Sequence, residues 1–267
     1  MRPVPTVQNL SAYCFVQLAD PHAWRAQIHA QAQARALRGT VLLAHEGINL
    51  VLAGAPEALD GFMAWLRHQA PFAALDAKLS WSPATPFRRL RVKVKPEIIR
   101  MNQPTVTPQR RRAPAVDAPT LARWLDAGHD DAGRPIALLD TRNGFEVDQG
   151  CFVGALDWRL TRFGDFPRAL REHQDELRGK TVVTYCTGGI RCEKAALWMA
   201  QTGLEPALQL EGGILRYLEH CGARHFQGAC FVFDERVALD ERLAPTALPA
   251  TVLPAAVHDA ARAGAFA

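Results

Sequence analysis

The chain has 267 residues, 48% of them hydrophobic and 22% charged, so it can bury a full core and is long enough for two domains. No long apolar core follows a basic start at the N-terminus, and no segment approaches a membrane span, so no contact with a membrane is expected. The six cysteines are scattered without a Cys-x-x-Cys pair, which argues against a zinc ribbon and against a disulfide framework. We therefore expect a reducing, cytoplasmic setting.

Net charge differs between the two halves of the chain. Residues 1–112 carry 15 Lys and Arg against 6 Asp and Glu, a net charge of +9. Residues 113–267 carry 16 against 21, a net charge of −5, and the whole chain carries +4. A basic half beside an acidic half predicts a polyanionic partner for the first half.

Two helices and five strands are predicted in the first half. The strands are expected at residues 12–18, 40–44, 48–53, 78–81 and 90–95. Asp20 followed by Pro21 is typical of a helix start, and this helix is expected to run to about Leu37 and to be closed by Gly39. A second helix is expected over residues 56–69, where apolar residues recur at helical spacing. The order strand-helix-strand-strand-helix-strand, plus one strand, predicts a ferredoxin-like α+β domain.

The last of these strands is strongly basic. From Phe87 to Lys95 charged and apolar residues alternate, so cations and apolar side chains lie on opposite faces of a strand. The cations are Arg89, Arg91, Lys93 and Lys95. Neighbouring cations on one face stand about 7 Å apart, close to the spacing of phosphates along a nucleic-acid strand. A second basic cluster follows at residues 110–112. We favour contact with nucleic acid over the alternative, a solvated edge strand that its charges protect from aggregation.

A linker and a second domain follow. Residues 102–119 are rich in proline and arginine and lack periodicity, which predicts a linker after a ferredoxin-like, RNA-binding domain of residues 1–101. Beyond it, apolar strands alternate with helical segments, which predicts a parallel sheet covered on both faces in an α/β domain of residues 120–222. Residues 223–267 are expected to form a C-terminal extension, with a closing strand over residues 228–237 and then a flexible Ala/Pro-rich tail.

The most informative segment is the run from Val182 to Cys192, because it delivers Cys186 to a glycine-rich turn after an apolar strand. A helix is expected directly afterwards, over residues 193–201. Backbone N–H groups of the turn and the positive end of the helix would stabilise a thiolate or persulfide on Cys186 and lower its pKa. Active sites of parallel sheets lie at this carboxyl end of the strands. We therefore assign Cys186 as the catalytic nucleophile.

The loop that begins with Cys186 ends with Arg191. Its other members are Thr187, Gly188, Gly189 and Ile190. The tyrosine-phosphatase signature has five residues between its cysteine and its arginine, whereas this loop has four, so phosphate hydrolysis is disfavoured. We expect Arg191 to stabilise negative charge on the sulfur or on RNA, and the two glycines to adopt conformations that a side chain would forbid. The alternative is a buried cysteine that only packs.

Other polar residues near this loop have two interpretations. Asp140, Arg142 and Glu146 could line a site, but we favour ion pairs of the scaffold. Cys192 could resolve an oxidised Cys186, but we favour a packed thiol at the start of the helix.

Motifs in both halves resemble those of the rhodanese-type tRNA uridine hydroxylases. The matching segments are Glu46–Asn49, Phe87–Lys95, Asp140–Asn143, Tyr185–Lys194, Glu211–Ile214 and Cys230–Val237. The resemblance covers residues from about 12 to 240. It implies a rhodanese-like catalytic domain around Cys186 and the oxygen-dependent conversion of the wobble uridine, position 34 of tRNA, to 5-hydroxyuridine. The tRNA anticodon stem-loop is then the expected partner, and DNA is not.

The resemblance implies molecular oxygen and an electron donor as co-reactants, but the sequence identifies no cofactor. The run His45-Glu46-Gly47-Ile48-Asn49 approximates the His-Glu-x-x-His zinc motif, yet Asn49 replaces the second histidine, so no metal site is expected. One mechanistic hypothesis has Cys186 or its persulfide attack C6 of uracil or activate oxygen at C5. The alternatives are a rhodanese-type sulfurtransferase, which would pass persulfide sulfur to an acceptor, and a non-catalytic RNA-binding module.

Overall fold

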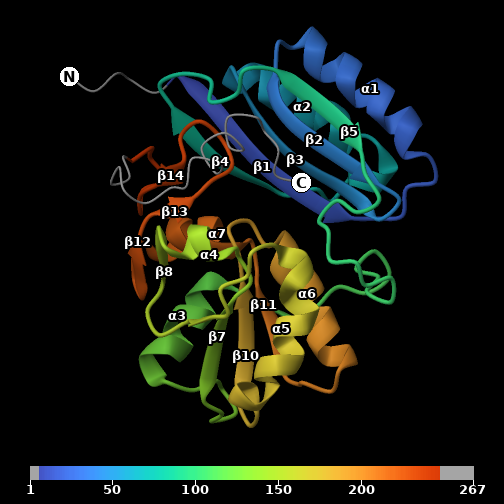
Figure 1. Cartoon of the computed structure of the whole chain (residues 1–267). Coiled ribbons are helices and arrows are strands. Elements are labelled where there is room, and N and C mark those ends of the chain that lie inside the picture. Colours follow the sequence, from blue (N-terminus) through green and yellow to red (C-terminus); the bar gives the residue numbers. More distant parts are fainter. Residues whose placement is uncertain (1–5, 247–267) are drawn as a thin grey trace.

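The computed structural model describes residues 6–246, which form an N-terminal unit above a C-terminal unit (Figure 1). In chain order, the N-terminal unit contains β1 (Val7–Phe15), α1 (Pro21–Ala34), β2 (Arg38–Ala44), β3 (Gly47–Gly54), α2 (Pro56–Arg67), the 3-10 helix η1 (Ala70–Phe72), β4 (Ala77–Ser82) and β5 (Leu90–Val94). Its strand order is β4-β1-β3-β2-β5, and all neighbours are antiparallel except β2 and β5. The first four strands and the two α-helices therefore have the ferredoxin-like topology that the sequence predicts.

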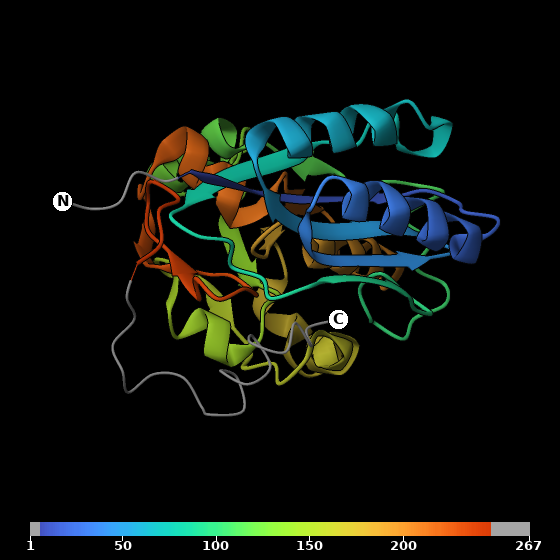
Figure 2. The same ribbon diagram turned by 90° about the horizontal axis from the view of Figure 1, so that it is seen from above.

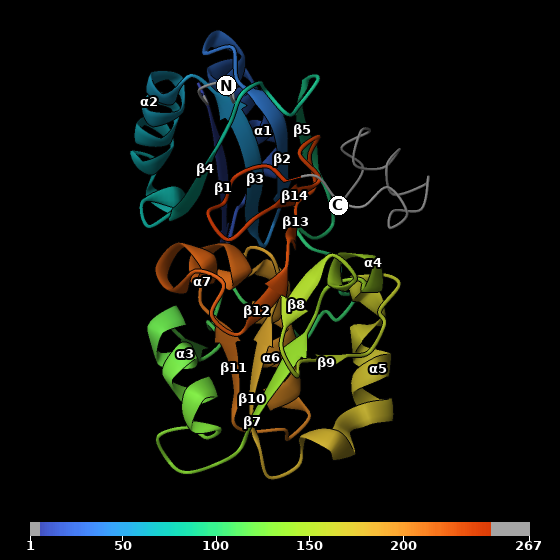
Figure 3. The ribbon, with the colours of Figure 1, turned by 90° about the vertical axis from the view of Figure 1, so that its left-hand side faces the viewer.

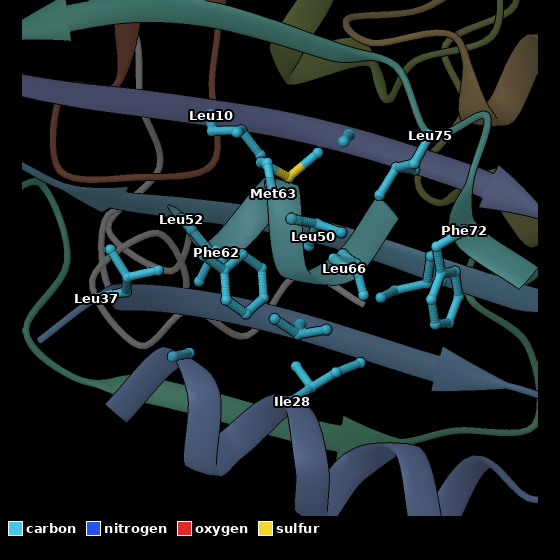
Figure 4. Packing of buried hydrophobic residues seen from close by; sticks show 14 of the residues in the cluster. Leu10, Ile28, Leu37, Leu50, Leu52, Phe62, Met63, Leu66, Phe72 and Leu75 are labelled. Atoms are coloured by element: carbon cyan, nitrogen blue, oxygen red, sulfur yellow. The ribbon is translucent and has the colours of Figure 1, made fainter. Parts of the chain in front are cut away.

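Helices α1 and α2 cover one face of this sheet and enclose the N-terminal core (Figures 2 and 4). Alternation along the strands sends Leu10 of β1 and Leu50 of β3 into this core, where they join Ile28 of α1 and Phe62 of α2. The alternate strand residues, such as Tyr13, project from the opposite face, which looks toward the C-terminal unit.

The start of α1 follows the sequence prediction, but its end does not. The Asp20 carboxylate accepts hydrogen bonds from two backbone N–H groups of the first turn, so it caps the helix as expected. The helix ends at Ala34, and Ala36 then turns the chain with a φ of +53°. Gly39, predicted to close the helix, instead lies inside β2 with a φ of +137°. A Cβ there would stand 2.1 Å from the backbone oxygen of Val51, so close contact with β3 requires this glycine.

In chain order, the C-terminal unit contains β6 (Ala115–Val116), α3 (Ala118–Ala127), β7 (Ile136–Asp140), α4 (Gly144–Val147), β8 (Gly150–Phe152), β9 (Leu156–Asp157), η2 (Phe163–Asp165), α5 (Phe166–His173), η3 (Gln174–Leu177), β10 (Thr181–Tyr185), α6 (Ile190–Gln201), β11 (Ala207–Leu210) and α7 (Gly213–Cys221). Its main sheet is parallel, in the order β6-β11-β10-β7-β9. Helices α3 and α7 cover one face, and α5 and α6 cover the other, as the alternation of strands and helices predicts (Figure 3). No helix within residues 6–246 is long and apolar enough to cross a membrane.

The C-terminal unit starts earlier along the chain than the sequence suggests. Strand β6 lies within residues 102–119, the segment predicted to be a linker, and pairs with β11. Val106 and Ala113 of the same segment pack in the core beneath α5 and α6. This segment is therefore attached to the C-terminal unit by pairing and packing. The flexible tail predicted at the C-terminus lies largely beyond residue 246, outside the described residues.

The prediction of a single closing strand over residues 228–237 is wrong. The chain forms β12 (Phe226–Gly228), which pairs with β8, and then a hairpin of β13 (Cys230–Phe231) and β14 (Ala238–Leu239). Val237, with a φ of +65°, lies in the turn that reverses the chain between β13 and β14. We call these last two strands and their turn the C-terminal hairpin.

Candidate active site between the two units

A cavity of about 480 Å³ lies between the two units. One wall is the face of the N-terminal sheet that the helices leave uncovered, and it carries Ser11, Tyr13 and Lys78. The opposite wall is the loop after β10, which presents Cys186, and the C-terminal hairpin adds Phe233. The volume is typical of a small-molecule site, and the position is the carboxyl end of the parallel strands.

Cys186 stands directly after β10 and is 1% exposed. Its sulfur accepts a hydrogen bond from the backbone N–H of Gly189, with an N–S distance of 3.2 Å. Burial by itself raises the pKa of this thiol, but a hydrogen bond from the Cys192 thiol, the charge of Arg191 and the backbone N–H groups of both residues outweigh burial. The pKa of Cys186 is therefore well below that of an ordinary thiol, which favours the thiolate form of its sulfur.

Cys192 is a fully buried thiol in the first turn of α6. Its Sγ donates a hydrogen bond to the backbone oxygen of Gly189 at 2.9 Å. Burial, followed by the charge of the neighbouring Cys186, raises the pKa of Cys192 well above the ordinary value. Cys192 therefore keeps its proton and lies in the packed position that we favoured.

Glycines shape this loop, although one of them differs from the sequence prediction. Gly189 has a φ of +104°, as expected, and a Cβ there would stand 2.9 Å from the hydroxyl oxygen of Tyr13. Gly188 has no left-handed φ, and a Cβ there would approach nothing closer than 3.8 Å, so the prediction for this glycine is wrong. Gly213, before α7, has a φ of +66°, and a Cβ there would stand 2.4 Å from the backbone oxygen of Cys186. The turn between β11 and α7 thus packs against the backbone of the Cys186 loop.

Arg191 is held by two parallel hydrogen bonds to the carboxylate of Glu146, with N–O distances of 2.6 and 2.7 Å. Both side chains are buried, and Glu146 is 0% exposed. The ion pair favoured for Glu146 is present, and its carboxylate holds Arg191, which lines the cavity with Cys186. Arg142, by contrast, is fully buried against Asp140 at 2.6 Å and is the scaffold ion pair that we favoured.

The remaining residues of the loop contact the cavity and the C-terminal hairpin. Gly188 and Ile190 line the cavity, and Ile190 begins α6. The Thr187 hydroxyl also lies at the cavity and donates a hydrogen bond to the backbone oxygen of Phe231 in β13 at 3.3 Å. The closing strand expected over residues 228–237 was not predicted to join the site. Its side chains that line the cavity are Val232, Phe233, Asp234, Arg236 and Leu239.

The cationic strand β5 presents its charges on the cavity side of the N-terminal sheet. In the pairing of β2 with β5, Thr40 lies opposite Arg91, and Leu42 lies opposite Lys93. Residues that lie opposite each other on neighbouring strands project from the same face. Because Thr40 and Leu42 line the cavity, Arg91 and Lys93 project from the face of the sheet that also looks toward Cys186.

The environment of β5 agrees with the predicted alternation. Leu90, Val92 and Val94 contact the N-terminal core. The four cations, Arg89, Arg91, Lys93 and Lys95, form no ion pair with any carboxylate of residues 6–246, and Arg89 and Lys93 are exposed. Desolvation first, and the neighbouring cations second, lower the pKa of Lys93. The strand thus concentrates positive charge that the described part of the chain leaves uncompensated.

Buried charged side chains of α6 join the two units. Lys194 of α6 is 1% exposed. Its Nζ donates hydrogen bonds at 2.7–2.9 Å to oxygens of Glu46, Glu97 and Ile99. Beside it, the hydroxyl of Tyr13 donates to the carboxylate of Glu193 at 3.0 Å. These contacts hold α6, and hence the loop, against the N-terminal unit. Within residues 6–246, no group of three or more His, Cys, Asp and Glu side chains is arranged to hold a metal ion.

The two sheets and the cysteine loop define a protein that joins an acylphosphatase-like domain to a rhodanese-like domain. The family model of the UPF0176 acylphosphatase-like domain matches residues 7–98, and that of the rhodanese-like domain matches residues 119–220. The chain is 60% identical over 242 residues to the tRNA uridine(34) hydroxylase of Bordetella petrii, covering 91% of this chain and 96% of that protein. It is 57% identical over 245 residues to the tRNA uridine(34) hydroxylase of Variovorax paradoxus, covering 92% and 93%. The chain belongs to the tRNA uridine(34) hydroxylase family.

Proposed function

We propose that this protein hydroxylates uridine 34 of tRNA with molecular oxygen and forms 5-hydroxyuridine in the cavity of Cys186. The observation that carries this proposal is that the Cys186 thiolate and the cations of β5 face the same side of the N-terminal sheet. A sulfur nucleophile supplies chemistry, and a row of cations supplies affinity for a phosphate backbone. The relatives named tRNA uridine(34) hydroxylase, which match about nine-tenths of the chain, support this assignment.

The anticodon stem-loop suits this arrangement. Its loop bases are unpaired and can be splayed out, so one base can enter a protein cavity at little cost in stacking. A cavity of about 480 Å³ accommodates one nucleotide but not a helix. The phosphates on either side of that nucleotide would then run along the surface where Arg91 and Lys93 project. We also infer a cytoplasmic location from the proposed tRNA substrate.

The chemistry requires an electron donor. Hydroxylation replaces the C5–H bond of uracil with a C5–O bond, and the second atom of O2 leaves as water after it takes up two electrons and two protons. Addition of the Cys186 thiolate to C6 would make C5 electron-rich and prepare it for the oxidant. Loss of the C5 proton and expulsion of the thiolate then restore the double bond. Arg191, held by Glu146, stabilises the thiolate that departs.

The proposal is tested by nucleoside mass spectrometry of tRNA from cells that contain the intact gene, no gene, or the Cys186→Ala variant. We expect 5-hydroxyuridine and its derivatives only with the intact gene. Cys221→Ala, which removes a half-buried thiol at the end of α7, is the matched control and should retain the modification. An unchanged content of 5-hydroxyuridine in cells without the gene would remove this function.

A sulfurtransferase is the second candidate, and the six-residue loop with its low thiol pKa favours it. Such an enzyme would carry sulfur as a persulfide on Cys186 but would not need the cationic strand. Purified protein should be assayed for sulfur transfer from thiosulfate to cyanide, with Cys186→Ala as the blank. Sulfur transfer by a protein that leaves tRNA unmodified would favour this second function.

A further inference from the structure

Lys78 is a buried lysine that the fold leaves without a polar partner. It lies on β4, is 7% exposed, and pairs with Ser11 of β1 on the cavity face of the sheet. Its ammonium stands 5.1 Å from the ring centre of Tyr13, and within residues 6–246 it makes neither a hydrogen bond nor an ion pair. The neighbouring carboxylate of Asp76 is paired with Arg216 instead. Because Lys78 lines the cavity and the described chain supplies no acceptor for its amine, a ligand in the cavity can supply that acceptor.

Lys78 extends from the N-terminal unit toward the catalytic loop. Its Cε lies 3.3 Å from the point where a Cβ on Gly212 would stand, so the glycine turn before α7 leaves room for the lysine. The next residue, Gly213, packs against the backbone of Cys186. Burial lowers the pKa of Lys78, and the charge of Asp76, and after it that of Cys186, acts against that shift. The amine of Lys78 and the sulfur of Cys186 therefore line one cavity from opposite walls.

We propose that Lys78 recognises the target base by donating a hydrogen bond to the carbonyl oxygen O4 of the uracil that enters the cavity. This inference rests on the proposed function, which brings a uridine to Cys186. A thiolate that adds to C6 attacks perpendicular to the plane of the ring, and the electrons of the C5–C6 double bond move onto C5 and O4. O4 is therefore the carbonyl oxygen that gains negative charge in this step, whereas O2 does not. We assign its hydrogen-bond donor to the ammonium on the opposite wall of the same cavity.

Two consequences follow from this hydrogen bond. Cytosine carries an amino group where uracil carries O4, so two donors would face each other and the site would reject cytosine. Negative charge that forms at C5 during the reaction spreads onto O4, so the same hydrogen bond strengthens as the reaction proceeds. Lys78 would therefore determine the choice of uridine and also raise the rate.

The experiment compares the purified full chain with two variants, Lys78→Met and Lys180→Met. Methionine keeps much of the buried stem but removes the donor. Lys180 precedes β10 at the end of the strand opposite Cys186, so the same exchange there is a matched control. Binding is measured for two anticodon stem-loop RNAs that differ only in uridine or cytidine at the target position. We expect the unaltered chain and Lys180→Met to prefer uridine, and Lys78→Met to lose that preference by on the order of 10- to 100-fold.

Two further measurements separate recognition from a structural role. Lys78→Met should unfold at the same temperature as the unaltered chain or higher, because it removes an unpaired buried amine. Lys78→Gln restores a neutral donor and should regain part of the preference for uridine. A lower unfolding temperature of Lys78→Met, with equal loss of affinity for both RNAs, would show that Lys78 only supports the fold and would overturn the proposal.

The remaining outcomes distinguish this inference from the proposed function. A Lys78→Met protein that still prefers uridine as strongly as the unaltered chain overturns the role of Lys78 and leaves the proposed function standing. An unaltered chain without any preference for uridine also overturns the role of Lys78, and tRNA mass spectrometry then decides separately whether 5-hydroxyuridine is formed.

Discussion

The Cys186 loop and the cations of β5 lie on the same side of the N-terminal sheet, but only the charges of the loop have partners within the described chain. In the loop, Cys186 is 1% exposed, and Arg191 is fixed by Glu146. On β5, the cations have no carboxylate partner among residues 6–246. A reactive thiolate needs fixed dipoles in dry surroundings, whereas a phosphate backbone needs cations that are free to pair with it. We therefore expect chemistry to depend on the C-terminal unit and affinity for RNA on the N-terminal unit.

Two buried lysines at the interface between the units also differ in whether their amines have hydrogen-bond acceptors. Lys194 donates to three oxygens and holds the units together. Lys78 is nearly as buried but has no acceptor within the described chain. Two lysines of similar burial therefore differ in whether the described chain supplies acceptors for their amines.

Removal of the sulfur is expected to have the largest effect. Cys186→Ala should abolish formation of 5-hydroxyuridine, because it removes the thiol that lines the cavity and accepts the N–H of Gly189. The affinity for tRNA and the unfolding temperature should stay close to those of the unaltered chain, because β5 is untouched. Nucleoside mass spectrometry, RNA binding and thermal unfolding measure the three quantities. A folded Cys186→Ala protein that still hydroxylates tRNA would contradict the catalytic assignment.

Removal of the Arg191 side chain is expected to lower the hydroxylation activity strongly, though less than Cys186→Ala does. Arg191→Ala raises the thiol pKa of Cys186 and leaves Glu146 buried without its partner, which should cost about 3–5 kcal/mol of unfolding free energy. The double variant Arg191→Ala/Glu146→Gln removes the stranded charge, so it should recover much of the stability but not the thiol pKa. Unchanged activity and thiol pKa in Arg191→Ala would show that this arginine is only structural.

Changes on β5 should have the opposite profile. Arg91→Ala/Lys93→Ala should weaken tRNA binding and flatten the slope of log K against log salt by about one unit per lost contact. Catalysis at saturating tRNA should survive, because these cations position the RNA and do not react. Arg178→Ala/Lys180→Ala, at the end of β10 opposite Cys186, is the matched control. If binding and its salt dependence are the same in both double variants, β5 is a solvated edge strand.

The smallest expected effect concerns how the rate of Cys186 alkylation depends on pH. A pKa of Cys186 well below the ordinary value means that its thiolate forms at a lower pH than that of an ordinary thiol. Its alkylation by iodoacetamide should therefore rise less steeply between pH 7 and pH 9 than that of an ordinary thiol, which reacts faster as pH rises toward its pKa of about 8.5. Mass spectrometry of the labelled peptide measures the rate, and Arg191→Ala should restore part of the pH dependence. A steep rise in the unaltered chain would show that the thiol is not activated.

Local patterns in the sequence determined much of this site. The alternation from Arg89 to Lys95 determined which side chains share a face, because successive side chains of a strand point to opposite sides. The order of strand, glycine loop and helix determined that Cys186 meets backbone N–H groups, because those groups lie beside it in the chain. The ferredoxin-like order of the first four strands followed from the same kind of short-range evidence.

The tertiary structure alone decided which of these features come together. The pairing of β5 with β2 turned its cations toward the cavity, and no local pattern names the neighbour of a strand. Glu146 and Arg191 are 45 residues apart, and the C-terminal hairpin reaches the loop from still farther along the chain. Lys78 stands in an ordinary strand sequence and is buried at the interface between the two units. Short-range sequence patterns reflect the conformational preferences of neighbouring residues. Burial and contacts across the cavity depend instead on how the two units pack.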